Sequence, residues 1–268
     1  MSEQASIFAP MRYFLRIRYK GTAYHGWQIQ QNAHSVQAEV NLALSRILRQ
    51  DIDTIGCGRT DTGVHADDFY LHFDVETPIA ETKRVLNRLD TMKISGIQFR
   101  ELFEVNEHAH ARFDATERAY EYRILRERNP FWDGLGHYFF GELDIVAMNT
   151  AAAMLLGKKD FVAFSKAHTQ VFTNICTVRH AAWTEQNGQL IFTIRADRFL
   201  RNMVRAIVGT LLEVGQGKRS ADSIPEILAK GNRSDAGMSV PACGLFLTEV
   251  IYPETILGQS LQNESEGK

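Results

Sequence analysis

The sequence predicts an α+β fold in which two βαββαβ units follow one another along the chain. Three observations support this prediction: segments whose apolar residues alternate, segments whose apolar residues recur at helical spacing, and the order of the two kinds. The 268 residues are 44% hydrophobic and 23% charged, which suits a globular protein with a sizeable core. This length is enough for two units of about 100 to 150 residues each.

The first unit begins with residues 12–21, where apolar and basic side chains alternate. Such alternation predicts a half-buried strand. Residues 35–50 then carry apolar side chains at helical spacing behind Ser35, a good helix N-cap. The rest of the unit follows as a short strand at 51–57, a polar loop, a strand at 69–75, a helix at 81–92 and a strand at 97–105.

The second unit shows the same order of segments. Residues 118–125 alternate as a strand does, and residues 143–157 have the pattern of a helix that closes at a glycine. The region 178–196 is interrupted by "QNGQ", and an Asn-Gly pair between two alternating runs predicts a β-hairpin. The remaining segments are an amphipathic helix at 197–215, a short helix at 224–230 and a strand at 244–252.

Two such units in tandem are typical of a pair of ferredoxin-like halves. We expect residues 1–108 to form the first half, which carries the polar loop, and residues 109–255 to form the second. We expect residues 256–268 to be a polar, flexible tail. The two halves share no similarity that is visible by eye, so the duplication depends on element order alone.

Composition excludes several classes of protein. The three cysteines are widely spaced, and no CxxC occurs, which argues against a disulfide framework or a zinc ribbon. The start of the chain lacks the features of a signal peptide, and its longest clean apolar run, 151–156, is too short to span a membrane. We therefore expect a soluble, cytoplasmic protein. The net charge of −2 means that any nucleic-acid site must be a local basic patch.

The polar loop "GRTDTGVHA" (58–66) contains Asp61-Thr62-Gly63, a tripeptide found in aspartic proteases. Those enzymes need two such loops so that two carboxylates share a proton, and this chain has one. Arg59 also favours full ionisation of a neighbouring carboxylate, which disfavours a shared proton. The tripeptide is a good turn sequence as well. Arg59, Asp61 and His65 nevertheless lie on a glycine-bounded loop between two strands, where functional groups are often placed.

The stretch "GCGRTDTGVHA" (56–66) resembles the motif around the catalytic aspartate of the TruA-type tRNA pseudouridine synthases. Further stretches resemble other motifs of that family, in order from Tyr13 to Tyr252. They are "YKGTAYHGWQIQ" (19–30), "SVQAEV" (35–40), "HARFDATERAYEYRI" (110–124), "DFVAFSK" (160–166), "FLRNMVRAIVGTLLEVGQG" (199–217) and "PACGLFL" (241–247). The sequence departs from the family pattern at residues 89–92, where a Leu-Pro-x-Asp step is common.

The resemblance implies the pseudouridine synthase fold, with two sheets joined across a central cleft. It also implies the reaction, in which the uracil of a uridine is detached from C1′, rotated and reattached through C5. Such a reaction needs neither a metal nor a cofactor, and the sequence contains neither a GxxxxGK[ST] loop nor a GxGxxG motif. We expect the scattered histidines to be structural or to contact RNA rather than to bind metal.

The resemblance assigns roles to individual residues. Asp61 matches the catalytic aspartate, acting as a nucleophile at C1′ or assisting glycosidic cleavage and proton removal. Arg205 matches an arginine beside that aspartate. Tyr120 matches the tyrosine that stacks on the target base, although a strand tyrosine is more often part of a core. Leu245 is implied as an apolar wall for the base. Arg59 is implied to contact RNA and displace the target nucleotide, the alternative being a salt bridge that orders the loop.

On the predicted helix 197–215, Arg198, Arg201 and Arg205 fall on one face. That face contacts the RNA backbone or is simply solvated. The resemblance also implies a homodimer that binds the anticodon arm of tRNA and modifies positions 38, 39 and 40. The expected basic cleft is supplied by Arg59, Arg112, Arg118, Arg123, Arg126, Arg198, Arg201 and Arg205. A non-catalytic RNA-binding module is the alternative function, because ferredoxin-like sheets with aromatic faces also bind RNA without chemistry.

Overall fold

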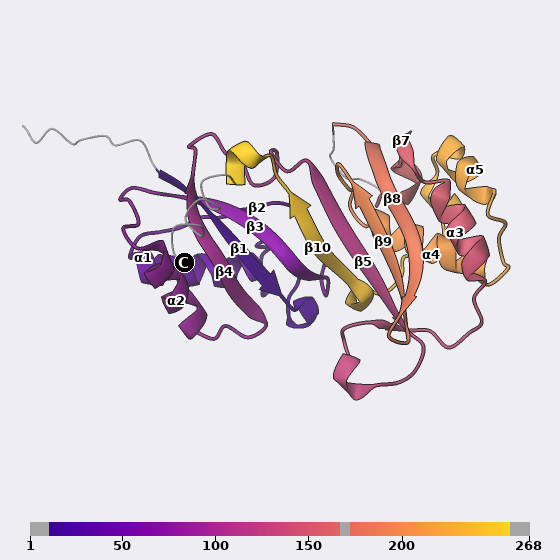
Figure 1. The fold of residues 1–268 in the computed structure, drawn as a ribbon, viewed down its shortest axis with the longest axis horizontal. Helices are drawn as coiled ribbons and strands as arrows, with labels where there is room; N and C mark the ends of the chain where they lie inside the picture. The colour runs from indigo at the N-terminus through magenta and orange to yellow at the C-terminus, as the bar shows by residue number, and fades with distance from the viewer. Residues whose placement is uncertain (1–10, 167–171, 258–268) are drawn as a thin grey trace, which may run out of the picture.

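The computed structural model describes residues 11–166 and 172–257 and confirms the α+β class (Figure 1). In the first half, the elements are β1 (Met11–Tyr19), α1 (Val36–Leu48), β2 (Ile55–Gly56), β3 (His65–Val75), α2 (Thr82–Thr91) and β4 (Ile97–Val105). In the second half, they are β5 (Glu117–Leu125), β6 (His137–Tyr138), α3 (Ile145–Ala153), β7 (Gly157–Asp160), β8 (Ile175–Gln186), β9 (Gln189–Ala196), α4 (Met203–Gly215), α5 (Ser223–Lys230) and β10 (Leu245–Ile251).

A single mixed sheet runs along the molecule in the order β4-β1-β3-β10-β5-β9-β8-β7. Each half has the strand order of a ferredoxin-like unit. The first half reads β4-β1-β3 with the short β2 beside β3, and the second reads β10-β5-β9-β8. The halves join edge to edge where β3 and β10 run parallel, with Phe246 opposite His65 and Leu247 opposite Ala66. The strands β6 and β7 are additions to the second unit.

Several predicted elements form for local reasons. The side chain of Ser35 accepts a hydrogen bond from the backbone of Ala38, so it caps α1 as expected. The β8–β9 hairpin turns at Asn187 and Gly188, and both residues have positive φ angles, as a two-residue primed turn requires. Helix α2 continues to Thr91, so the departure from the family pattern at 89–92 does not break this helix.

The predicted helix at 197–215 is wrong over its first six residues, because α4 begins only at Met203. Asn202 adopts the left-handed conformation, with a φ of 65°. Its side chain donates a hydrogen bond to Ser239, and the Asp197 carboxylate accepts one from the backbone of Thr177. These contacts hold 197–202 in a non-helical path. Arg198 therefore does not share a helix face with Arg205.

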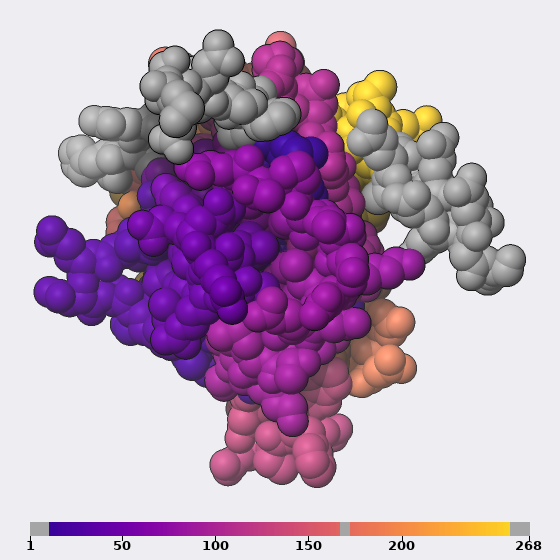
Figure 2. All heavy atoms as spheres, turned by 90° about the vertical axis from the view of Figure 1, so that its left-hand side faces the viewer, coloured from indigo at the N-terminus to yellow at the C-terminus, as the bar shows by residue number. Residues whose placement is uncertain are grey.

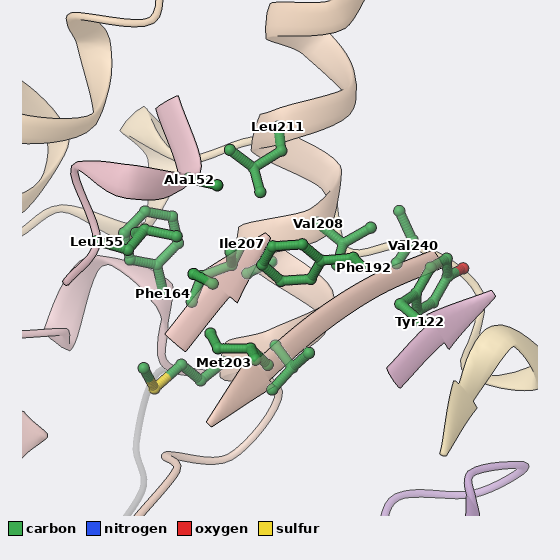
Figure 3. Packing of buried hydrophobic residues seen from close by; sticks show 14 of the residues in the cluster. Tyr122, Ala152, Leu155, Phe164, Phe192, Met203, Ile207, Val208, Leu211 and Val240 are labelled. Atoms are coloured by element: carbon green, nitrogen blue, oxygen red, sulfur yellow. The ribbon is translucent and has the colours of Figure 1, made fainter. Parts of the chain in front are cut away.

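Two hydrophobic cores lie along the sheet, one in each half. In the second core, Tyr122 and Phe192 on the sheet pack against Met203, Ile207 and Leu211 of α4 (Figure 3). Tyr120 packs against both cores. Val64 follows the Asp61 loop in the first half, yet it is buried in the second core. The loop between β2 and β3 therefore packs against both halves.

Two long connections lie between the main elements, and the first of them includes the short strand β6. Residues 126–144 project from one end of the sheet beyond β5 (Figures 1 and 2). The segment 106–116 links the halves and places Ala109, Ala111 and Ala115 in the first core, and the division at 108/109 remains a prediction. Ile256 and Leu257 pack against the first core, whereas the remainder of the expected tail lies outside the described residues.

Candidate active site

The loop that carries Asp61 lies between β2 and β3, and backbone contacts from the segment after β1 hold it. The hydroxyls of Tyr19 and Thr60 are 2.8 Å apart. The backbone N–H of Trp27 donates to the Thr60 carbonyl at 3.3 Å, and that of Gly63 donates to the Tyr24 carbonyl at 3.3 Å. The position of the Asp61 backbone is thus set by a segment about 40 residues earlier in the chain.

Two glycines of this segment explain the pattern "YKGTAYHGW". A Cβ atom on Gly21 would lie 2.0 Å from the carbonyl oxygen of Val64. A Cβ atom on Gly26 would lie 2.4 Å from the carbonyl oxygen of Thr60, and Gly26 also has a positive φ of 87°. Both clashes are with backbone, which cannot rotate away as a side chain can. Only glycine lets the two segments approach this closely.

The Asp61 carboxylate lies between two guanidinium groups that come from the other half of the molecule. Arg205 Nη1 is 3.5 Å from Asp61 Oδ2, and Arg201 Nε is 3.8 Å from Asp61 Oδ1. Arg205 is itself fixed, because its Nε donates to the Val240 carbonyl at 2.8 Å. The Asp61 side chain is 28% exposed, so it is paired but still open to solvent. The predicted proximity of Asp61 and Arg205 is confirmed, and Arg201 joins them from the turn that precedes α4.

Tyr120 lies beside this ion pair. Its ring is half-buried and packs edge-on against Phe199, with ring centroids 5.1 Å apart and an interplanar angle of 87°. Burial raises the pKa of the Tyr120 hydroxyl, and the negative charges of Cys57 and Asp61 in their ionised forms raise it further. The hydroxyl therefore stays neutral at physiological pH. Tyr120 therefore packs against the core and is also partly exposed. The sequence had left open whether it is a core residue or a surface on which a base stacks, and the structure is compatible with both.

Leu245 is almost fully buried, with 6% of its surface exposed, and it lies opposite Tyr122 in the β10–β5 ladder. The segment before it borders the Asp61 loop. A Cβ atom on Gly63 would lie 3.4 Å from the Cβ of Ala242. The structure therefore brings the loop of residues 58–66 and the "PACGLFL" segment together.

His65 is a further residue of the loop, and the structure gives it a fixed role. The backbone N–H of Gly21 donates to its Nδ1 at 3.1 Å, and its Nε2 is 3.2 Å from the Cys243 carbonyl oxygen. The imidazole must therefore carry its proton on Nε2 and donate it to Cys243. Burial lowers the pKa of His65 to about 4, so the ring is neutral at physiological pH. His65 thus connects the two halves and does not add charge to the site.

A group of arginines lies close to the Asp61 loop. Burial lowers the pKa of Arg112, and the charges of Arg59, Arg118 and Arg198 lower it further. These effects require that each of the three guanidinium groups lie near that of Arg112. Within the described part of the chain, no ion pair involves Arg59, Arg112 or Arg198. The salt bridge that was the alternative for Arg59 is therefore absent from these residues.

Arg118 is used differently from its neighbours. Its Nη2 donates to the carbonyls of Cys57 and Arg112 at 3.0 and 2.6 Å. Its Nη1 donates to the carbonyls of Ala115 and Asp197 at 2.9 and 3.0 Å. One guanidinium thereby joins the start of the Asp61 loop, the linking segment and the turn that carries Arg198 and Arg201. The sequence pattern placed Arg118 in an RNA-binding cleft, but its donors are occupied by the protein backbone.

Arg123 also departs from the expected cleft. It forms an ion pair with Glu121 at 2.9 Å and lies 3.9 Å over the ring of Phe246. Because Tyr122 faces the second core, the next residue along β5 faces the opposite side of the sheet. A pocket of about 470 Å³ lies on that side, lined in part by Arg18, His65 and Arg123. Asp61 does not line it, so Arg123 belongs to a different surface.

Over residues 11–166 and 172–257, no three side chains of His, Cys, Asp or Glu are grouped to hold a metal ion. No helix within these ranges is long and apolar enough to cross a membrane.

Comparison with known proteins connects this geometry to a family. A family model described as tRNA pseudouridine synthase matches residues 151–253. The tRNA pseudouridine synthase A of Bacteroides thetaiotaomicron is 47% identical over 251 residues, which cover 92% of this chain and 93% of that protein. The corresponding proteins of Bacteroides fragilis and Colwellia psychrerythraea are 48% and 38% identical, over 91% of this chain and 98% and 95% of theirs. The chain therefore belongs to the tRNA pseudouridine synthase A family.

Proposed function

We propose that this protein converts uridine to pseudouridine at positions 38, 39 and 40 in the anticodon arm of tRNA, with Asp61 as the catalytic carboxylate. Membership of the family identifies it as an isomerase of this reaction class. The observation that carries the assignment of the site is the Asp61 carboxylate held between Arg201 and Arg205.

The reaction is an isomerisation, so every atom that leaves the uridine must return to it. The C1′–N1 bond breaks, the uracil rotates, and C5 bonds to C1′. The proton on C5 is then lost, and N1 gains one. Asp61 serves this sequence either by forming an ester with C1′ that C5 later displaces, or by stabilising the positive charge that develops at C1′ and taking the C5 proton. Both routes require an ionised carboxylate.

Arg205 and Arg201 supply the environment for that carboxylate. A cation within about 4 to 6 Å favours the charged form of an acid. Arg205 is anchored to Val240 by its Nε, so its Nη1 keeps a fixed orientation toward Asp61. Arg201 is 57% exposed, and among the described residues Asp61 is the one ion-pair partner of its guanidinium, so it is the more mobile partner. We infer that Arg201 turns toward a phosphate when RNA binds, whereas Arg205 remains at the carboxylate.

In this proposal the half-buried Tyr120 supplies the surface for the base, and the small exposed part of Leu245, 6%, borders it. An aromatic ring and an aliphatic side chain hold a flat uracil without fixing its edges by hydrogen bonds. A base held in this way is free to rotate in its own plane, and the reaction requires such rotation. Phe199 packs edge-on against Tyr120 and keeps its ring in position.

The arginines around the loop bind the RNA backbone in this proposal. Arg59, Arg112 and Arg198 gather at the Asp61 loop and use no carboxylate of the described chain. Phosphates are the natural partners of such a cluster, although the whole chain carries a net charge of −2. Arg59 also displaces the target nucleotide from the stack, because it is exposed and lies two residues from Asp61. We further propose that the protein acts as a homodimer in the cytoplasm and that one tRNA contacts both subunits.

The test uses unmodified tRNA transcripts incubated with the wild-type protein and with Asp61→Asn. Pseudouridine is mapped by reverse-transcription stops after carbodiimide treatment. We expect modification at positions 38, 39 and 40 by the wild type, and a loss on the order of 10³-fold or more for Asp61→Asn. Asp67→Asn is the matched control, because Asp67 lies on the same segment, is 56% exposed and pairs only loosely with Arg18 at 3.4 Å.

Two results would overturn this assignment. If the wild type leaves every uridine of the anticodon arm unchanged, the proposed substrate is wrong. If Asp61→Asn keeps full activity, the proposed site is wrong. A non-catalytic RNA-binding module would bind the transcript equally well with either residue and would modify nothing, and membership of an enzyme family disfavours it.

A further inference from the structure

Phe113 is an exposed aromatic residue beside the arginine cluster. It lies in the segment that links the halves, and 75% of its surface is exposed. One side of the ring is covered by His110, with ring centroids 4.2 Å apart. The guanidinium of Arg112 lies 5.8 Å from the centre of the same ring. The ring is therefore in contact with His110 while most of its surface faces solvent.

The turn that presents Phe113 is held in one conformation. The backbone N–H groups of Arg112 and Phe113 both donate to His110 Nδ1, at 3.1 and 3.3 Å. The backbone N–H of His110 donates to the Asp114 carboxylate at 2.7 Å, and that of Ala111 donates to His72 at 3.1 Å. Because the backbone is ordered before any ligand arrives, little conformational entropy is lost when the ring is covered.

Arg118 places this turn next to the catalytic loop. Its Nη2 bonds the carbonyls of Arg112 and Cys57 simultaneously, and Cys57 is four residues before Asp61. Arg112 in turn is close enough to Arg59 and Arg198 for their charges to lower its pKa. Phe113, the residue after Arg112, therefore lies beside the arginine cluster, and Arg118 connects its turn to the start of the Asp61 loop.

An open aromatic surface beside cations that use no carboxylate of the described chain matches one kind of ligand, a nucleobase flanked by phosphates. We propose that Phe113 is a stacking platform for a base that neighbours the target uridine along the RNA. In this proposal Arg112 and Arg198 bind the phosphates that flank that base. The inference rests on the proposed function, and it adds a second base-binding position to the one formed by Tyr120.

The experiment compares Phe113→Ala, Phe113→Leu and Phe113→Trp. Binding of a tRNA transcript is measured in the Asp61→Asn background, where no turnover occurs, and single-turnover rates are measured in the active background. Stacking on an aromatic residue predicts that Ala and Leu weaken binding by about 5- to 100-fold, whereas Trp restores it. The rate at saturating RNA stays within about threefold of wild type, because Phe113 does not touch the reacting atoms.

Phe131→Ala is the matched control. Phe131 is also strongly exposed, at 88%, but it lies on the projecting segment 126–144. Its replacement should leave binding and rate unchanged. Phe113 is at the surface, so its variants should keep the thermal stability of the wild type, and circular dichroism melting checks this. If Phe113→Ala does not fold, the Leu and Trp variants decide the question.

A second measurement identifies the base. Transcripts with one abasic nucleotide at each position near the target are bound to wild-type and Phe113→Ala protein. At the position whose base stacks on Phe113, the abasic change should weaken binding of the transcript to the wild-type protein. It should leave binding to Phe113→Ala unchanged, because that variant has no ring for the base to stack on. The stacking proposal is refuted if the effects of the abasic change and of Phe113→Ala on binding are additive at every position. It is also refuted if Phe113→Leu binds the transcript as tightly as the wild type does. Failure of wild-type turnover would overturn the proposed function alone, because these binding measurements do not depend on it.

Discussion

Replacement of Arg118 tests whether one guanidinium holds the catalytic loop against the second half of the molecule. The four bonds go to carbonyls in three separate segments: Cys57 of the Asp61 loop, Arg112 and Ala115 of the link, and Asp197 before α4. In Arg118→Met the aliphatic volume is largely kept, but all four carbonyls lose their donor. In Arg118→Lys the charge is kept, but a single ammonium cannot reproduce the planar fork.

The magnitude follows from the number and kind of bonds. A hydrogen bond to a charged group contributes about 1.5 to 3 kcal/mol, so four bonds set an upper limit of about 6 to 12 kcal/mol. Part of the group is near solvent, and water will reach some of the freed carbonyls. We therefore expect Arg118→Met to lower the free energy of unfolding by about 3 to 5 kcal/mol. For Arg118→Lys we expect a loss of about 2 kcal/mol, since one or two carbonyls keep a donor.

The assay is urea-induced equilibrium unfolding, combined with pseudouridine formation below the unfolding transition. We expect activity to fall more steeply than the folded fraction, because Arg118 no longer fixes the position of the Asp61 loop relative to the turn that carries Arg201. Arg123→Lys is the control on the same strand: its pair with Glu121 is partly exposed, at 24% and 29%, and lysine keeps the charge, so the loss should be about 1 kcal/mol or less. If Arg118→Lys unfolds within about 0.5 kcal/mol of wild type and keeps full activity, the reasoning is refuted.

Three further predictions concern the loop and its surroundings. Gly26→Ala places a carbon 2.4 Å from a carbonyl of the Asp61 loop at a positive φ, so unfolding experiments should show a loss of roughly 2 to 4 kcal/mol; Gly58→Ala, with nothing within 4 Å, should be tolerated. His65 and His72 have pKa values lowered to about 4, so the unfolded chain binds more protons below pH 6.5. Stability should therefore be complete above pH 6.5 and fall by up to about 1.4 kcal/mol per pH unit for each histidine between pH 6.5 and 4; urea unfolding at pH 7 and 5 measures this, and His72→Gln should show a smaller fall. Arg205→Lys keeps a charge beside the catalytic carboxylate but loses the fork, so single-turnover rates should fall by about 10- to 100-fold with RNA binding nearly unchanged; an unchanged rate would exclude a role for the fork.

Local patterns in the sequence were sufficient for most elements. The Asn187-Gly188 pair predicted the β8–β9 hairpin because the turn needs two residues that tolerate positive φ, and this is a property of those residues alone. Ser35 predicted the start of α1 for the same kind of reason. The start of α4 could not be predicted in this way. Asn202 leaves the helical conformation because of a hydrogen bond to Ser239, 37 residues later.

In the candidate site, too, some features could be predicted from local sequence and others depend on tertiary contacts. The order of the motifs identified the family, and the resemblance of residues 56–66 to one motif led to the prediction of Asp61 as the catalytic carboxylate. The sequence pattern could not distinguish Arg118 from Arg112, because both are arginines within the stretch 110–124. The carbonyls of Cys57, Arg112, Ala115 and Asp197 converge on Arg118 only when both halves are packed together.

The sequence by itself therefore determined the fold class, the family and the residue types available to the site. These depend on side-chain periodicity, turn chemistry and motif order, which are local along the chain. The tertiary structure decided which charges meet. It placed Arg205 against Asp61 across 144 residues, and it committed the Arg118 guanidinium to backbone carbonyls, including that of Arg112 next to Phe113. The physical reason is that ion pairs and burial depend on distances of a few ångströms between segments, and only the packing of β3 against β10 sets those distances.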